Sequence, residues 1–255
     1  MVALITGASS GIGRDFAREL ADIGFDLILV ARRKERLIEL QNELPVSVTI
    51  IPMDLSKPEN CFSLHEQLKL IDIDVLINNA GFGLFGEFVD TDLDTELNMI
   101  SLNITATHIL TKLFIRDFVK RDRGFLLNVS SSAAFPAGGP LMATYYATKS
   151  YVYKFTEGIY QELRKKGSNV SVSVLCPGPV RTEFNRRADV EFAVGSLSSQ
   201  EVARYAVKKM FNKTRVITPG LTIKLTHELV RFVPETLALR VAYHIQHRKD
   251  AKNKR

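Results

Sequence analysis

Cysteine is scarce in this chain of 255 residues, which contains Cys61 and Cys176 and no others. The two lie far apart in the sequence, and the five histidines show no ligand-like spacing with them. A disulfide framework and a zinc site therefore both lack the residues that they need. We expect two free, buried thiols and no bound metal.

Long apolar runs are also missing. The longest stretch without a charged residue, 124–148, contains Pro136, Pro140, three glycines and three consecutive serines. One helix of that composition could not satisfy its backbone in lipid, so the stretch is not a membrane span. The chain opens on an apolar strand with no basic n-region or apolar h-region, and we expect no signal peptide and a cytoplasmic protein.

The chain has little net charge outside its end. The formal charge is +6, but the segment 221–255 carries eight Lys or Arg against three Asp or Glu. The other 220 residues therefore hold a net charge of only +1. Because the basicity belongs to the tail, we expect no nucleic-acid partner.

What the sequence contains is a regular alternation of apolar strands and amphipathic helices, without internal repeats, low-complexity tracts or a linker. Such alternation predicts a single α/β domain: a seven-stranded parallel sheet with helices on both faces. The expected strands are 2–6, 26–30, 46–54, 73–77, 125–129, 170–175 and 216–217. The expected helices are 12–23, 37–44, 58–70, 92–121, 145–166 and 198–211, the last opening on a capping box.

We assign 1–220 to a dinucleotide-binding and catalytic domain, with a substrate lid at about 177–198. The remainder, 221–255, is expected to be a C-terminal amphipathic helical extension with a basic tail, part of the same domain. Its simplest role is a helix packed over the substrate pocket. Self-association, or loose contact with an acidic membrane surface, is the alternative.

The first strand runs into a glycine-rich turn with Gly7, Gly11 and Gly13. Glycines leave no Cβ between backbone N–H groups and a ligand, and the following helix aims its positive end at the same place. The turn therefore predicts a pyrophosphate site. Plain chain reversal is the alternative, because the spacing differs from the commoner G-x-G-x-x-G.

Basic residues follow the second strand, where an NAD-binding turn commonly places a carboxylate for the ribose 2′-hydroxyl. Here the positions hold Arg32, Arg33 and Lys34. A guanidinium fork suits a 2′-phosphate, so the pattern favours NADP(H). The alternative is that these residues start a solvated helix.

Tyr145 and Lys149 are one helical turn apart and share a face. Proton exchange by a phenol near pH 7 requires about 4 kcal/mol of stabilisation of its anion. An ammonium about 5 Å away supplies on the order of 3 kcal/mol, and an oxidised nicotinamide would add positive charge. Ser131 ends the preceding strand, where its hydroxyl could hold a substrate carbonyl beside the phenol. Asn103, buried in the long helix, needs hydrogen-bond partners and suits a structural or relay role.

In order and spacing, these motifs resemble the classical short-chain dehydrogenase/reductase family over about residues 2–218. The matching segments are Thr6-Gly7-x-x-x-Gly11-Ile12-Gly13, Asn78-Asn79-Ala80-Gly81, Asn103, the serine run, Tyr145-x-x-x-Lys149 and Pro177-Gly178-Pro179-Val180-x-Thr182. Jointly they are far more specific than any one of them.

The resemblance implies that the predicted sheet is a Rossmann-type, doubly wound α/β domain. It also implies hydride transfer between NAD(P)H and a carbonyl or alcohol. It implies Tyr145 as the acid/base and Lys149 as the group that lowers its pKa and holds the nicotinamide ribose. Ser131 would orient the substrate, and Asn103 would support a proton-relay water. The residues expected at the cofactor are Gly7, Ser9, Ser10, Gly11, Ile12, Gly13, Arg32, Arg33, Asp54, Leu55, Asn78, Ala80, Gly81, Tyr145, Lys149, Pro177, Gly178, Val180 and Thr182.

Two positions depart from the family pattern. The usual interval of thirteen residues before the tyrosine would select Ser132, whereas the local pattern Asn128-Val129-Ser130-Ser131-x-Ala133 selects Ser131. We choose Ser131, with one extra residue around 137–139. Tyr146 follows Tyr145 directly, but Tyr145 has the four-residue step to Lys149.

We therefore expect an NADP(H)-dependent oxidoreductase of the carbonyl reductase or alcohol dehydrogenase type, acting on a small-molecule carbonyl or alcohol as a homodimer or homotetramer. The alternatives are a non-catalytic nucleotide-binding regulatory or scaffold protein of the same fold, and an epimerase or dehydratase with tightly held cofactor. Apolar residues expected near the pocket favour an apolar substrate without identifying it: Phe82, Leu84, Phe85, Phe135, Leu141, Met142 and Phe184.

Overall fold

The computed structural model describes residues 1–181, 183 and 197–253. In it, seven parallel strands form one sheet in the order β3-β2-β1-β4-β5-β6-β9, which confirms the expected sheet. The strands are β1 (Val2–Thr6), β2 (Asp26–Ala31), β3 (Val48–Pro52), β4 (Ile73–Asn78), β5 (Phe125–Val129), β6 (Ser171–Leu175) and β9 (Val216–Ile217).

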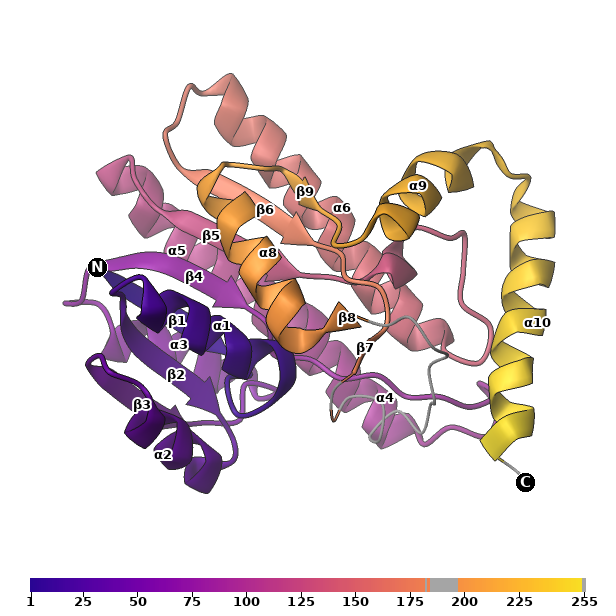
Figure 1. The fold of residues 1–255 in the computed structure, drawn as a ribbon, viewed down its shortest axis with the longest axis horizontal. Helices are drawn as coiled ribbons and strands as arrows, with labels where there is room; N and C mark the ends of the chain where they lie inside the picture. Colours follow the sequence, from indigo (N-terminus) through magenta and orange to yellow (C-terminus); the bar gives the residue numbers. More distant parts are fainter. Residues whose placement is uncertain (182, 184–196, 254–255) are drawn as a thin grey trace.

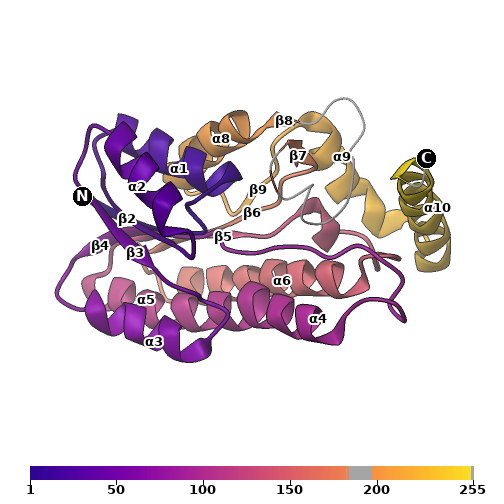
Figure 2. The same ribbon diagram turned by 90° about the horizontal axis from the view of Figure 1, so that it is seen from below.

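Helices cover both faces of the sheet, so the molecule has three layers (Figure 2). One face carries α1 (Gly11–Asp22), α2 (Lys34–Glu43) and α8 (Ser199–Phe211). The opposite face carries α3 (Pro58–Gln67), α4 (Leu93–Ile100), α5 (Thr107–Arg121) and α6 (Ala143–Lys165). Helix ends differ from the expected ones by up to three residues, as periodicity alone defines them loosely.

The apolar strands of the sheet supply both halves of the core. In β1, Ile5 packs into a cluster with Phe16 of α1, whereas Leu4 packs into a second cluster with Leu110 of α5. Successive strand residues point to opposite faces, and both faces are covered, so each residue is buried. This explains why β1 and β2 read as nearly continuous apolar runs. Cys61 and Cys176 are free and buried, as expected.

One long helix was expected at 92–121, and the chain is helical there, but not uniformly α. A π-helical segment, η1 (Ser101–Ala106), lies between α4 and α5. Such wide turns interrupt the regular hydrogen-bond ladder and are often found at functional sites. Asn103 lies inside η1, with its side chain buried.

Two very short strands, β7 (Val180–Arg181) and β8 (Leu197–Ser198), pair with each other outside the main sheet. Two residues are too few to show a strand periodicity, which is why the sequence did not predict them. Ser198 also caps α8 through the expected capping box with Glu201. Most of the predicted lid, namely 182 and 184–196, lies outside the described residues.

The C-terminal extension forms α9 (Leu221–Leu229), η3 (Val230–Phe232) and α10 (Glu235–Asn253). Figure 1 shows both helices beyond the carboxyl ends of the strands. Ile223 of α9 packs on Gly178, and Leu239 of α10 packs on Gly138, so the extension lies over the loops that follow β6 and β5. Within the described residues, no helix is long and apolar enough to cross a bilayer.

Candidate active site

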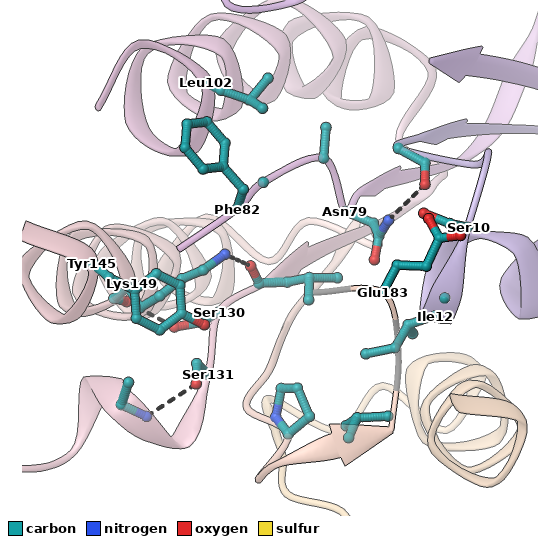
Figure 3. A pocket seen from close by; sticks show the side chains of 18 of the residues that line it. Ser10, Ile12, Asn79, Phe82, Leu102, Ser130, Ser131, Tyr145, Lys149 and Glu183 are labelled. Carbon is teal, nitrogen blue, oxygen red and sulfur yellow. Dashed lines mark hydrogen bonds between the residues drawn. The ribbon is translucent and has the colours of Figure 1, made fainter. Parts of the chain in front are cut away.

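A cavity of about 680 Å³ opens at the carboxyl ends of the strands, at the β1–β4 crossover where the strand order reverses. This is where parallel α/β sheets bind ligands. Its wall joins the glycine turn after β1 to the serine run after β5 and to α6 (Figure 3). Expected site residues that line it are Gly7, Ser9, Ser10, Gly11, Ile12, Arg32, Arg33, Asp54, Leu55, Ala80, Gly81, Ser131, Tyr145, Lys149, Pro177, Gly178 and Val180.

The glycine turn is shaped by close packing of backbone against backbone. Gly7 has a φ of 68°, and a Cβ on it would be 2.8 Å from the Cα of Ala80. A Cβ on Gly13 would be 2.3 Å from the Gly7 carbonyl oxygen, a distance that real Cβ atoms do not adopt. Gly13 is not among the residues lining the cavity. Its role is therefore to let α1 approach the turn.

The start of α1 has the character of an anion site. Its first turn has no acidic residue, and the side chain of its N-cap, Ser10, makes no capping hydrogen bond. Ser10, Gly11 and Ile12 all line the cavity. Free N–H groups at the positive end of a helix bind phosphate oxygens, so this turn fits a pyrophosphate.

Two adjacent asparagines, Asn78 at the end of β4 and Asn79 directly after it, have different roles. Asn78 does not line the cavity: its side chain is buried and donates to Thr111 and Asn128 at 3.1 and 2.9 Å. The expected contact of Asn78 with the cofactor therefore has no support from the cavity's lining, and it stays a prediction. Asn79 lines the cavity instead and donates to the Thr6 carbonyl at 3.0 Å, which ties β4 to the turn. Successive side chains along a strand point in opposite directions. Because Asn78 points into the core, Asn79 was the better prediction for the residue that faces the cavity.

Of the three basic residues after β2, Arg32 and Arg33 line the cavity, and each of these arginines contacts a carboxylate. Arg32 lies 3.9 Å from Asp54, and Arg33 lies 2.9 Å from Glu183. Arg33 also donates to the Ser9 hydroxyl at 3.2 and 3.3 Å, which holds it against the glycine turn. The sequence reasoning missed Glu183, and it missed Arg36, which contacts the same carboxylate.

At the other end of the cavity, Tyr145 and Lys149 project from α6 toward Ser131 (Figure 3). The Tyr145 phenol shares a hydrogen bond with the Ser131 side chain. Ser131 also accepts a hydrogen bond from the Ala133 backbone at 3.1 Å, whereas Ser132 contributes its backbone N–H to the Pro177 carbonyl. The contact with the phenol favours Ser131 over Ser132 as the serine that acts with Tyr145.

Burial opposes the expected lowering of the phenol's pKa by Lys149, and that lowering, which also involves a bound nicotinamide, stays a prediction. Both side chains are buried, with exposed fractions of 8% and 5%. Burial raises the pKa of Tyr145 to about 12 and lowers the pKa of Lys149 to about 8. The Lys149 ammonium donates to the Val129 carbonyl at 3.0 Å and lies 5.9 Å from the Tyr145 ring centre. Desolvation of the charged forms therefore outweighs their attraction.

Asn103 holds the loop after β4 in place. Its side chain donates to the Phe82 carbonyl at 2.9 Å and to Thr148 at 3.1 Å, and it accepts from the Phe82 backbone N–H at 3.1 Å. It therefore links the loop after β4 to α6, one residue before Lys149. These bonds satisfy the amide, and Asn103 is not among the residues that line the cavity. The expected relay water stays a prediction.

The loop after β6 and the C-terminal helices form the last wall. Pro177, Gly178 and Val180 line the cavity, whereas Thr182 lies outside the described residues. Ile223 of α9 and Gln246 of α10 also line it, and Gln246 donates to the Tyr146 hydroxyl at 2.8 Å. The sequence reasoning missed Gln246, because nothing local connects it to a tyrosine 100 residues earlier.

The cavity connects a turn suited to binding phosphate with an ionisable phenol, and it lies on a doubly wound sheet. This combination defines the class of protein as a Rossmann-type oxidoreductase. The comparison with known proteins agrees. A family model described as short chain dehydrogenase matches residues 1–191, three quarters of the chain. The chain belongs to the short-chain dehydrogenase family.

Individual relatives are similar over most of this chain. A very-long-chain 3-oxoacyl-CoA reductase of Laccaria bicolor is 36% identical over 68% of this chain and 53% of its own length. A 17-beta-hydroxysteroid dehydrogenase type 3 of Mus musculus is 32% identical over 72% and 61%. A solved short-chain dehydrogenase from Sphingobium yanoikuyae in complex with NADPH is 32% identical, with a TM-score of 0.82 over 91% of this chain and 92% of that one. The chain thus spans between about half and three fifths of these curated relatives.

Proposed function

We propose that this protein is an NADP(H)-dependent oxidoreductase that interconverts an apolar carbonyl compound and its alcohol. One observation carries the proposal: Ser131, Tyr145 and Lys149 share a single cavity with an anion-binding turn and with Arg33. A nicotinamide cofactor is bound by a relative of the same fold, as its complex with NADPH records. The preference for the 2′-phosphate rests on Arg32 and Arg33.

The residues present fit such a cofactor. The open N-terminus of α1 would hold the pyrophosphate, and Arg33, fixed by Ser9, would hold a phosphate on the adenosine ribose. When bound, the cofactor supplies or accepts the hydride. No other redox group is needed for that chemistry.

The proton is handled by the chain's own side chains. Ser131 and the Tyr145 phenol are hydrogen-bonded to each other, so both hydroxyls can converge on one substrate oxygen. A pKa of about 12 keeps the phenol protonated near neutral pH, so it carries the proton that a carbonyl oxygen needs. The positive charges of Lys149 and of an oxidised nicotinamide would lower that pKa toward the range in which a phenol exchanges protons. When the phenol has lost its proton, the Lys149 ammonium supplies a positive charge beside the phenolate and stabilises it.

The substrate end of the cavity favours an apolar molecule. Phe82, Leu102, Met142 and Ile223 line it together with the rings of the two tyrosines. The relatives compared above are named for very-long-chain 3-oxoacyl-CoA and for 17-beta-hydroxysteroids, both of which carry a large apolar body. We propose a ketone or aldehyde of that kind as the substrate class.

A panel of ketones and aldehydes with NADPH or NADH, followed by nicotinamide absorbance, tests the proposal. The panel should include long-chain 3-oxoacyl thioesters, keto steroids and bulky aromatic ketones. Turnover with at least one of them, lost in Tyr145→Phe while nucleotide still binds, is the expected result. Nucleotide binding with no turnover of any carbonyl or alcohol would favour the non-catalytic alternative. Turnover without net cofactor consumption would favour an epimerase or dehydratase.

We further propose self-association through the exposed faces of α5 and α6. His108 on α5 contacts the Tyr151 hydroxyl at 2.6 Å and stacks on Phe155 with ring centres 4.8 Å apart. A partly exposed aromatic group of this kind is typical of interfaces. Light scattering after size exclusion would give the mass. The cytoplasmic location and a membrane contact of the basic tail also stay predictions.

A further inference from the structure

Two arginines near the glycine turn are held together by one carboxylate that comes from far along the chain. Glu183 follows β7 and is separated from Arg33 and Arg36 by 150 and 147 residues. One of its oxygens accepts from Arg33 at 2.9 Å and the other accepts from Arg36 at 2.5 Å. The carboxylate thus takes up a guanidinium donor with each oxygen, as a phosphate group would.

The carboxylate lies within the cavity wall, not on a remote surface. Glu183, Arg33 and Ser9 all line the same cavity, and Figure 3 shows Glu183 at the end where Ser10 and Ile12 lie. The exposed fraction of the side chain is 24% for Glu183, 41% for Arg33 and 38% for Arg36. Hydrogen bonds from Arg36 and Arg33 lower its pKa to about 2, so it is an anion at any physiological pH.

We propose that Glu183 is an internal competitor of the cofactor's 2′-phosphate and thereby sets the selectivity between NADP(H) and NAD(H). This inference rests on the proposed function, since it needs Arg33 to be a phosphate ligand. A phosphate that approaches Arg33 meets a carboxylate already bound there, and two anions repel at close range. The carboxylate must leave its two arginines before the phosphate can take them.

The competition affects only nucleotides that carry a 2′-phosphate. NAD(H) carries a neutral hydroxyl at that position and does not need the arginine pair, so Glu183 can stay in place when it binds. NADP(H) binding includes the loss of both ion pairs. Removal of the negative charge at residue 183 therefore favours nucleotides with the 2′-phosphate and leaves the others unchanged.

Calorimetric titration with 2′,5′-ADP and 5′-ADP isolates this effect from catalysis. Glu183→Gln keeps the size of the side chain and removes its charge. We expect this variant to bind 2′,5′-ADP roughly 5- to 30-fold more tightly than the unmodified chain, the factor that corresponds to two partly exposed ion pairs. Its affinity for 5′-ADP should change less than twofold. Glu66→Gln is the matched control, because Glu66 lies on α3, pairs with Lys69 and does not line the cavity.

The possible outcomes separate the inference from the proposed function. If both proteins prefer 2′,5′-ADP to the same degree, Glu183 does not compete, and the inference fails while the NADP(H) preference stands. If Glu183→Gln weakens 5′-ADP, the carboxylate serves the ribose hydroxyl, and the inference is again wrong. If neither protein prefers 2′,5′-ADP over 5′-ADP, the arginines do not bind the phosphate, and the cofactor preference falls together with the inference.

Discussion

The Lys149 ammonium donates to the Val129 carbonyl at 3.0 Å and lies 5.9 Å from the centre of the Tyr145 ring. The helix spacing brings the two side chains to one face, and the packing of β5 against α6 decides what each contacts. Because both side chains are buried, the charged form of Lys149 loses its contact with water. This desolvation lowers the pKa of Lys149 to about 8. A buried cation held next to a phenol by a backbone carbonyl is unfavourable for stability and useful for proton transfer.

Lys149→Met should show that cost as a pH-dependent difference in stability. Burial lowers the lysine pKa from 10.5 to about 8, so the folded state gives up its proton first as the pH rises. Between those values the unfolded chain binds more protons, and the stability of the unmodified protein rises with pH relative to the methionine variant. The full difference is on the order of 3 kcal/mol. Denaturant unfolding of both proteins at pH 7, 8, 9 and 9.5 covers about 2 kcal/mol of this difference.

The expected pattern is a gap in favour of Lys149→Met that is constant below pH 8 and shrinks above it. The lost hydrogen bond to Val129 shifts the gap at every pH alike, so the slope is the readout. A gap that does not vary between pH 7 and 9.5 would show that Lys149 keeps an ordinary pKa in the folded protein.

Ser131→Ala and Ser132→Ala separate the two candidate serines. Ser131 is hydrogen-bonded to the Tyr145 phenol, so its loss should lower kcat/KM by roughly 10²-fold, the usual effect of removing one hydroxyl or N–H donor from a reacting oxygen. Ser132 supports the loop with its backbone, and its alanine variant should retain activity within a few-fold. Steady-state kinetics on the best substrate of the panel decides. The reverse order of effects would reassign the role to Ser132.

Gly13→Ala should destabilise the protein and weaken nucleotide binding together. The new methyl group would lie 2.3 Å from the Gly7 carbonyl oxygen, so the turn or α1 must shift. Overpacking of this kind costs about 1–3 kcal/mol. Gly158→Ala is the control: it lies in α6, a Cβ there meets nothing within 4 Å, and the change should stabilise by about 0.5–1 kcal/mol. Thermal unfolding and titration with 5′-ADP give both quantities, and equal behaviour of the two variants would contradict the packing role of Gly13.

Gln246 and Tyr146 should be energetically coupled. Gln246 of α10 donates to the Tyr146 hydroxyl at 2.8 Å, and Gln246 is buried. Loss of either partner leaves a polar group of the other without that bond, at a cost of about 1–3 kcal/mol. The double variant Gln246→Leu, Tyr146→Phe should be less destabilised than the sum of the single ones. A double-mutant cycle by denaturant unfolding tests this, and strict additivity would mean that α10 is not held there by this bond.

The sequence predicted the sheet well because its central strands, such as β1 and β4, are almost fully buried, whereas the edge strand β3 is partly exposed. A residue such as Leu4 or Ile5 must be apolar whichever face of the sheet it lies on. The strand is therefore visible in the sequence alone as an apolar run. The capping box at Ser198 was predicted for a similar reason, since all its atoms belong to four consecutive residues. The π-helical segment and the short pair β7 and β8 were missed, because neither has a local signature.

The sequence by itself determined the turn after β1, the step from Tyr145 to Lys149 and the order of strands and helices. These depend on neighbours along the chain, whose geometry is nearly independent of the rest of the molecule. Tertiary structure alone decided that Asn79 and not Asn78 faces the cavity, that Ser131 meets the phenol, and that Glu183 binds arginines about 150 residues away. It also decided the sign of the pKa shift at Tyr145, since desolvation depends on everything packed around a group and not on the residue four positions along the helix.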